Sequence, residues 1–228
     1  MGNKNLIITI EREYGSGGRI VGRKLAEELG LHFYDDEILK MASEKSAVGE
    51  EFFRLADEKA GNNLFHRLAG AKKADVFGKP SLKGDVTSPD NLFKFQAMVM
   101  RELAEQEPCV FVGRAAGYVL DQDEEIENLV RIFVYADRVR RVQRVMEVDC
   151  ISEERAKKRI RKIENERKNY YKYFTGNDWK NMKNYDQYGP PRTGRDGGAD
   201  QGICEVARVY EVRENENNLS VMQAKNFS

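Results

Sequence analysis

The chain has 228 residues, of which 33% are charged and 40% are hydrophobic, and its formal net charge is +0. This length suits one α/β domain with an insertion or a tail, and the balanced charge argues against a protein that coats nucleic acid over its whole surface. The cysteines Cys109, Cys150 and Cys204 form no C-x-x-C pair, so they indicate neither a disulfide framework nor a zinc site. We find no secretory signal and no run of about 18 apolar residues, and therefore expect a cytoplasmic protein without a membrane span.

The first predicted element is a short buried strand that leads into a glycine-rich turn. Residues Leu6–Ile10 are apolar and β-branched, as in a buried strand. The turn reads Gly15-Ser16-Gly17-Gly18, and a helical pattern then runs from Arg19 to a stop at Gly30. This order aims backbone N–H groups and the positive end of a helix dipole at a phosphate. Glycine turns of this kind also serve packing alone, so both interpretations stay open at this point.

The turn departs from the standard phosphate-loop pattern G-x-x-x-x-G-K-[ST]. Arg12 takes the place of the leading glycine, Gly18 that of the lysine, and Arg19 that of the serine or threonine. The lysine that reaches the phosphates and the hydroxyl that binds magnesium are therefore both missing. Arg19 or an arginine later in the chain is a candidate for the missing charge, and Ser16 or an acidic residue is a candidate for the magnesium ligand.

A second short strand, Leu31–Tyr34, is followed by two aspartates. Asp36 is placed to cap a helix that runs from Glu37 to about Lys45. For Asp35 and Asp36 we weigh capping alone against a role in ligand binding, and the pattern does not decide between them.

The middle of the chain contains two predicted helices on either side of a polar segment. Residues 50–59 are charged and helical in pattern, and residues 91–106 resume helical spacing before Pro108. Between them, residues 61–90 are rich in Gly, Lys and Ser, and we interpret this segment as a long mobile insertion, a kind of loop that often covers a binding site.

An arginine directly follows the third predicted strand. Cys109–Val112 is short and apolar, and Gly113-Arg114 comes immediately after it. In an open α/β sheet, ligands bind outside the carboxyl ends of the strands, and a guanidinium at such an end can grip a phosphate with two hydrogen bonds. We favour this ligand role for Arg114 over a surface salt bridge.

A fourth predicted strand, Leu129–Tyr135, precedes two basic helices. The second helix starts at Ser152, a credible N-cap with acidic residues in the first turn. The basic side chains of the two helices exceed what a solvated face needs, and they include Arg138, Arg140, Arg141, Arg144, Arg155, Lys157, Lys158, Arg159, Arg161, Lys162, Arg167 and Lys168. Four strands that alternate with helices predict an α/β fold with a mostly parallel sheet flanked by helices.

Three strings of the sequence together resemble the cytidylate kinase-like family, which is related to the nucleoside monophosphate kinases. They are ITIEREYGSGGRIVGRKLAEELGLHFYDDEIL, FVGRAAGYVL and RIRKIENERKNYYKYFTGNDWKNMKNYD, and the resemblance covers roughly Asn5 to Asp186. It implies a P-loop NTPase fold of the nucleoside monophosphate kinase type with a helical lid, here at about residues 150–175.

The resemblance also implies a three-part site with ATP and Mg²⁺ as cofactors. Donor phosphates would be cradled by Gly15, Ser16, Gly17, Gly18 and Arg19. The acceptor monophosphate would be gripped by Arg114, with Asp35, Arg138 and Arg141 as further substrate-binding residues. The lid would bring Arg159, Lys162 and Arg167 over the transferring group, where together with Arg19 they would supply catalytic charge. Such a site works mainly by positioning and electrostatic stabilisation.

The end of the chain differs from the end that the resemblance implies. After NYD, relatives continue into a short apolar strand and a helix, whereas residues 187–228 are Gly/Pro-rich and then polar, without a clear core strand. We interpret them as an atypical, poorly ordered tail beyond a domain of residues 1–186. One choice of codons for Glu205–Val212, read one base later, encodes an end like that of the family, so we hypothesise a frameshift that sequencing of the gene would reveal.

We therefore predict a nucleotide-binding protein that transfers the γ-phosphate of ATP to a nucleoside monophosphate such as CMP. One alternative is a nucleotide-sensing regulatory protein that binds without turnover, which the absent lysine supports. A second alternative is a nucleic-acid-binding module that uses the basic helices, although we do not expect a nucleic-acid partner.

Overall fold

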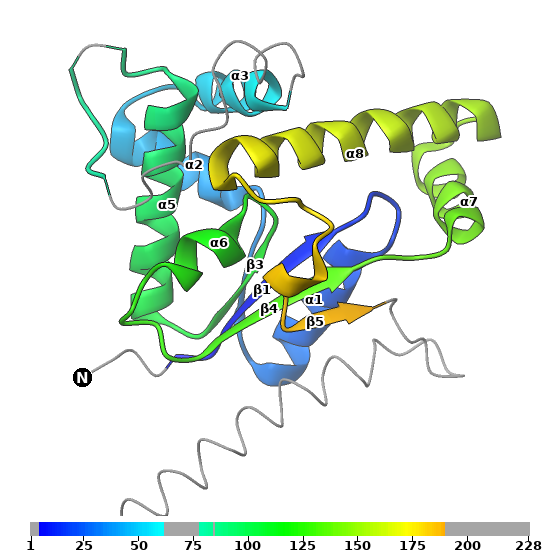
Figure 1. Cartoon of the computed structure of the whole chain (residues 1–228), viewed down its shortest axis with the longest axis horizontal. Coiled ribbons are helices and arrows are strands. Elements are labelled where there is room, and N and C mark those ends of the chain that lie inside the picture. The colour runs from blue at the N-terminus through cyan, green and yellow to red at the C-terminus, as the bar shows by residue number, and fades with distance from the viewer. Residues whose placement is uncertain (1–4, 62–77, 84, 190–228) are drawn as a thin grey trace, which may run out of the picture.

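The computed structural model describes residues 5–61, 78–83 and 85–189 (Figure 1). Within them, five strands form one sheet in which every neighbouring pair is parallel, in the order β2-β3-β1-β4-β5. The strands are β1 (Ile7–Arg12), β2 (His32–Tyr34), β3 (Cys109–Val112), β4 (Leu129–Val134) and β5 (Gln187–Gly189). The predicted α/β fold with a mostly parallel sheet is confirmed.

Helices cover both faces of this sheet. They are α1 (Gly18–Leu29), α2 (Glu37–Ser46), α3 (Glu50–Ala60), α5 (Pro89–Gln106), α6 (Ala116–Asp121), α7 (Arg138–Asp149) and α8 (Glu153–Thr175), with a short 3-10 turn at Met182–Asn184. No helix of the described segments combines the length and the apolar character that a membrane crossing needs.

The alternation of side chains along the strands divides the core in two. On one face, Ile8 and Ile10 of β1 pack with Val21 and Leu25 of α1. On the other face, Ile7 and its neighbours pack against α2, α3, α5 and α6. Because both faces are buried, the strands read as continuous apolar runs, which explains why the sequence pattern identified them.

The helix α7 pairs with the first half of α8, whereas Tyr171 and Phe174 in the last half of α8 belong to the main core. A small cluster between the two helices, with Val142 and Val145 of α7 against Ala156 and Ile160 of α8, holds them together. In Figure 1, α8 runs across the end of the sheet toward which β1 and β4 point. This helix therefore carries its side chains to the edge where ligands bind in such folds.

Two predicted features of the chain differ in the structure. β1 continues beyond its predicted end at Ile10 to Arg12, because Glu11 and Arg12 stay paired with Phe133 and Val134 of β4. The side chains of Ser152 and Asp36 occupy N-cap positions but make no capping hydrogen bond, whereas Asp137 caps α7 by accepting from Val139 N at 2.8 Å.

We predicted no clear core strand after Asp186, and this prediction is wrong. Residues Gln187–Gly189 form β5, which pairs with Ile132–Val134 of β4. The ring of Tyr188 stacks on that of Phe133 with centroids 4.8 Å apart, so an aromatic contact replaces the apolar run that a core strand usually shows. The remainder of the predicted tail, and residues 62–77 and 84 of the predicted insertion, lie outside the described residues.

The position of β5 predicts that residues 187–189 stabilise the sheet. A chain that stops after Asp186 should have a free energy of unfolding at least about 1 kcal/mol lower than a chain that stops after Gly189, because it loses the stacking of Tyr188 on Phe133. Urea unfolding of the two truncated chains measures the difference. Equal midpoints for both would show that β5 adds nothing to the sheet.

Candidate functional site

Polar residues gather where the parallel strands end. β1 ends in Glu11 and Arg12, Asp35 follows β2, and Arg114 follows β3. Because the strands point the same way, these residues meet at one edge of the sheet, as the position of Arg114 in the sequence predicted.

The glycine-rich turn wraps around the start of α1. Gly15 and Gly17 have φ angles of 78° and 89°, which side chains rarely adopt, and Gly17 is the N-cap of α1. Ser16 is fully buried, and its Oγ lies 3.4 Å from Gly18 N as an acceptor. Arg144 of α7 donates to the carbonyl oxygen of Gly15 at 2.9 Å. The turn is thus closely packed, and it presents the N-terminus of α1 to the edge of the sheet.

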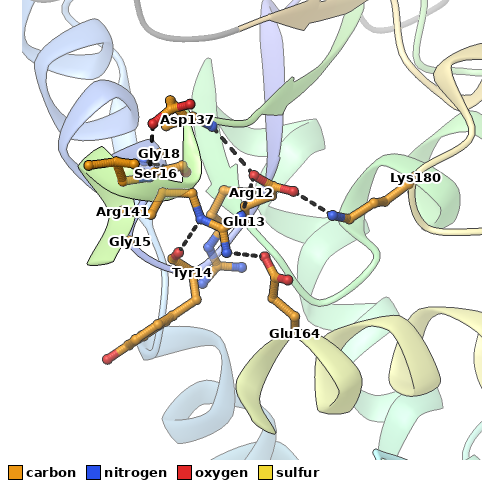
Figure 2. Close-up of polar contacts among 12 residues, drawn as sticks. Arg12, Glu13, Tyr14, Gly15, Ser16, Gly18, Asp137, Arg141, Glu164 and Lys180 are labelled. Carbon is orange, nitrogen blue, oxygen red and sulfur yellow. Dashed lines mark hydrogen bonds and ion pairs between the residues drawn. The ribbon is translucent and has the colours of Figure 1, made fainter. Parts of the chain in front are cut away.

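Beneath this turn lies a buried arginine, Arg141 (Figure 2). Its Nη1 pairs with Glu13 Oε2 at 2.8 Å, its Nε donates to the carbonyl oxygen of Tyr14 at 2.9 Å, and its Nη2 pairs with Glu164 of α8. Glu13 also pairs with Lys180. Arg141, which we predicted to bind substrate, therefore joins the turn to α7 and α8 in this structure.

A cavity of about 410 Å³ opens beside Arg114, and we call it the Arg114 cavity. Arg114 Nη1 donates to Asp57 Oδ2 of α3 at 2.5 Å and to Gln96 Oε1 at 3.3 Å, and its Nη2 lies 3.7 Å from Asp36. Burial alone would lower the pKa of Arg114, but the negative charge of Asp57 reverses this and raises it. Arg114 is thus a charged guanidinium at the wall of a polar cavity.

The backbone at Arg114 is strained. Gly113, Arg114 and Ala115 have φ angles of 81°, 57° and 53°, and left-handed residues other than glycine cost about 1–3 kcal/mol each. The buried carboxylate of Glu11 holds this conformation, because its Oε1 accepts from Ala115 N at 3.2 Å and its Oε2 accepts from Trp179 Nε1 at 2.9 Å. Backbone strain of this kind is characteristic of residues whose side chains must point into a functional site.

A second cavity, of about 380 Å³, lies over the glycine-rich turn, and we call it the glycine-loop cavity. Gly15, Gly17, Gly18 and Arg19 line it, together with Arg144. Both cavities share four lining residues, which are Arg12, Asp35, Asp36 and Arg167. The two cavities therefore meet at these residues, which we call the junction.

Two cationic side chains, Arg12 and Arg167, line the junction. Arg167 of α8 donates from Nη1 to the carbonyl oxygen of Arg12 at 2.8 Å, and its guanidinium lies 5.6 Å from the ring centre of Tyr14. Burial and the charge of Arg12 lower the pKa of Arg167 to about 9. Burial also lowers the pKa of Arg12, and nearby Arg114 contributes in the same direction. Because burial disfavours the charged forms of both arginines, an anion bound beside them would stabilise these charges.

Asp35 supplies part of the opposite charge. Its carboxylate is largely buried, lies 2.6 Å from Arg19 Nε and 3.8 Å from Arg12 Nη2, and forms no helix cap. Capping alone is therefore wrong for Asp35. Arg19 itself is 58% exposed and lies at the rim of the glycine-loop cavity.

The remaining predicted residues are dispersed along α7 and α8. Lys162 lines the Arg114 cavity but is 74% exposed, and Arg159 pairs with Asp149 at 2.8 Å. Arg138 lines a separate cavity between α7 and α8 that shares no residue with the other two. Our site prediction did not include Arg12, Asp57 and Arg144, although the altered phosphate-loop pattern had marked the position of Arg12.

The residues of the glycine-rich turn do not fit a standard magnesium site. Within residues 5–61, 78–83 and 85–189, no group of three or more His, Cys, Asp or Glu side chains is placed to hold a metal ion. Arg19, a cation, stands where the standard pattern has its magnesium-binding hydroxyl.

The fold is shared with a solved protein structure. An uncharacterized protein from Eubacterium ventriosum ATCC 27560 is 24% identical, with 81% of this chain and 89% of that chain covered and a TM-score of 0.56. Shikimate kinases from Acinetobacter baumannii and Bacteroides thetaiotaomicron are 16% and 14% identical. The match to the Acinetobacter baumannii enzyme covers 95% of this chain and 97% of that chain, with a TM-score of 0.39. The match to the Bacteroides thetaiotaomicron enzyme covers 92% of this chain and 98% of that chain, with a TM-score of 0.43. No curated protein matches the chain.

Comparison with family models identifies the chain more specifically. The model described as the cytidylate kinase-like family matches residues 7–188. This range includes the glycine-rich turn, Arg114, α8 and most of β5. The chain belongs to the cytidylate kinase-like family.

Proposed function

We propose that the protein transfers the γ-phosphoryl group of ATP to a nucleoside monophosphate such as CMP. The observation that carries this proposal is the meeting of the glycine-loop cavity and the Arg114 cavity at Arg12, Asp35, Asp36 and Arg167. Two substrates bound in these cavities would place their phosphates side by side. The description of the family as cytidylate kinase-like supports the same reaction class.

Each cavity offers a different kind of phosphate contact. In the glycine-loop cavity, the N-terminus of α1 supplies backbone N–H groups and the positive end of its dipole to the ATP phosphates. In the Arg114 cavity, the guanidinium of Arg114 would bind the acceptor phosphate through the Nη2 group that now faces Asp36 at 3.7 Å. The strained backbone held by Glu11 fixes the direction of this arginine.

The reaction exchanges one phosphorus–oxygen bond for another. An oxygen of the acceptor monophosphate attacks the γ-phosphorus, the bond from the γ-phosphorus to the bridging oxygen breaks, and ADP leaves with that electron pair. A phosphate oxygen is already ionised, so no general base is required. This fits the surroundings of Asp35, which is paired with Arg19 and Arg12 rather than directed at an acceptor hydroxyl.

Arginines would neutralise the negative charge of the transferring phosphoryl group. Arg12 and Arg167 lie at the junction, and burial lowers the pKa values of both. A phosphoryl group bound between them would offset the cost of burying these charges, and cations held in place before reaction are the main source of stabilisation in phosphoryl transfer. The cofactor of this proposal is ATP, and because the described residues do not fit a standard magnesium site, no step is assigned to Mg²⁺.

A direct assay tests the proposed function. ADP formation is measured in a coupled assay with CMP, UMP, dCMP or AMP as acceptor, and the binding of ATP and of each acceptor is measured by calorimetry on the same preparation. We expect turnover with at least one monophosphate. Binding without turnover for every acceptor would favour a nucleotide-sensing protein instead.

Replacement of Arg114 should affect the acceptor alone. Because a charge-assisted hydrogen bond contributes about 1.5–3 kcal/mol, Arg114→Gln should raise the KM of the monophosphate about 10- to 100-fold and leave the KM of ATP nearly unchanged. Arg138→Gln is the matched control, since Arg138 lies outside both cavities. An equal rise in the KM of ATP would contradict the assignment of Arg114 to the acceptor monophosphate.

Replacement of Arg167 should weaken the binding of ATP with little effect on the stability of the nucleotide-free protein. Its lowered folded-state pKa means that at pH 7 folding disfavours the charged form, and this cost offsets the hydrogen bond that Arg167 donates to the carbonyl oxygen of Arg12, so Arg167→Gln should change the melting temperature of the nucleotide-free protein little. The same change should reduce the rise in melting temperature that ATP produces. Thermal unfolding with and without ATP checks both, and a large loss of stability without nucleotide would contradict the electrostatic interpretation.

A further inference from the structure

We infer that Arg12 supplies the positive charge of the missing phosphate-loop lysine. The glycine and the cation of the standard pattern have exchanged positions, so that the cation is at position 12 and the glycine at position 18. In the standard pattern the first position is glycine and the seventh is lysine. Here position 12 holds arginine and position 18 holds glycine, while Gly17 keeps its place. This inference deepens the proposed function and rests on it, because it assigns the charge that the phosphoryl transfer needs.

The structure explains why the exchange has to be reciprocal. A Cβ atom added at Gly18 would lie 2.5 Å from Arg12 Cβ, 3.0 Å from Arg12 Cγ and 3.3 Å from Val134 Cβ. Such contacts cannot be relieved by moving the end of a flexible chain, because these atoms lie next to the backbone of two paired strands. Only one of the positions 12 and 18 can therefore carry a side chain while the backbone keeps this arrangement.

The guanidinium of Arg12 reaches the junction from the end of β1. A Cβ atom at Gly113 would lie 2.0 Å from Arg12 Nη1 and 3.0 Å from Arg12 Cζ, so the guanidinium passes directly over this glycine at the end of β3. On its other side it lies 3.8 Å from Asp35. Its side chain is 18% exposed and lines both cavities.

The contacts of Arg12 keep its charge available for a phosphoryl group. Asp35, its ion-pair partner at 3.8 Å, is closer to Arg19, at 2.6 Å, and so is shared between two cations. The backbone of Arg12 is fixed by pairing with β4 and by Arg167, which donates to its carbonyl oxygen. A cation that is positioned before the reaction and only partly neutralised stabilises the charge that develops in phosphoryl transfer. Arg12 would thus contact the transferring group and act as a catalytic residue.

The test compares variants at the two positions. Arg12→Met keeps much of the side-chain volume but removes the charge, Arg12→Lys keeps the charge, and the pair Arg12→Gly with Gly18→Lys restores the standard order. We measure kcat, the KM of each substrate, melting temperature, and the affinity for a dinucleoside pentaphosphate that spans both cavities.

We expect Arg12→Met to lower kcat by about 10²–10³-fold, with the affinity for ATP changed much less, and Arg12→Lys to retain part of the rate. Gly18→Lys alone should lower the melting temperature because of the collision with Arg12, and the double variant should melt higher than Gly18→Lys and turn over faster than Arg12→Gly. Unchanged kcat in Arg12→Met would overturn the inference. So would a double variant that folds and binds ATP but is no faster than Arg12→Gly.

The pentaphosphate measurement separates this inference from the proposed function. If the wild-type protein shows no turnover with any monophosphate, the proposed function fails. The position of the Arg12 guanidinium between the two cavities is then still tested, because Arg12→Met should weaken the binding of the pentaphosphate more than the binding of ATP or CMP alone. Equal pentaphosphate affinity in Arg12→Met and the wild type would overturn the inference whatever the activity.

Discussion

The buried guanidinium of Arg141 connects the segments that form the glycine-loop cavity. It pairs with Glu13 of the turn and with Glu164 of α8, and α7 carries it. A buried arginine between two carboxylates is costly to break, by about 3–5 kcal/mol when one partner is removed. The turn, α7 and the middle of α8 are therefore held as one unit. Arg167, less than one turn beyond Glu164, reaches the junction as a consequence.

This connection bears on the lid that the family resemblance implies. Glu164 and Arg167 attach the middle of α8 to the turn and to β1, whereas Arg159 and Lys162 are exposed. Many basic side chains of α8 pair with acidic residues, as in Lys157–Glu153 and Lys158–Glu154. This pairing reduces the support for a nucleic-acid-binding module. The lid that the resemblance implies, at about residues 150–175, therefore stays a prediction.

Much of the fold and part of the site followed from the sequence, for physical reasons. Four of the strands were short apolar runs, and Arg114 was found because Gly113-Arg114 directly follows one of them. Asp57 was not indicated by the sequence, because its contact with Arg114 depends on how α3 packs against α2, α5 and α8. Arg138, Arg141 and Arg144 all belong to α7, but Arg141 and Arg144 contact the turn, whereas Arg138 lines a separate cavity. Arg12 was hidden because the sequence pattern shows the missing lysine but not the closeness of positions 12 and 18.

The central claim is that two phosphate-bearing substrates bind together, one in each cavity. A crystal structure with a non-hydrolysable ATP analogue and CMP tests it most directly. Our account predicts the triphosphate on the glycine-rich turn from Gly15 to Arg19, the CMP phosphate on Arg114, and the guanidinium of Arg12 between them. Triphosphate density elsewhere, or CMP bound away from Arg114, would contradict the account.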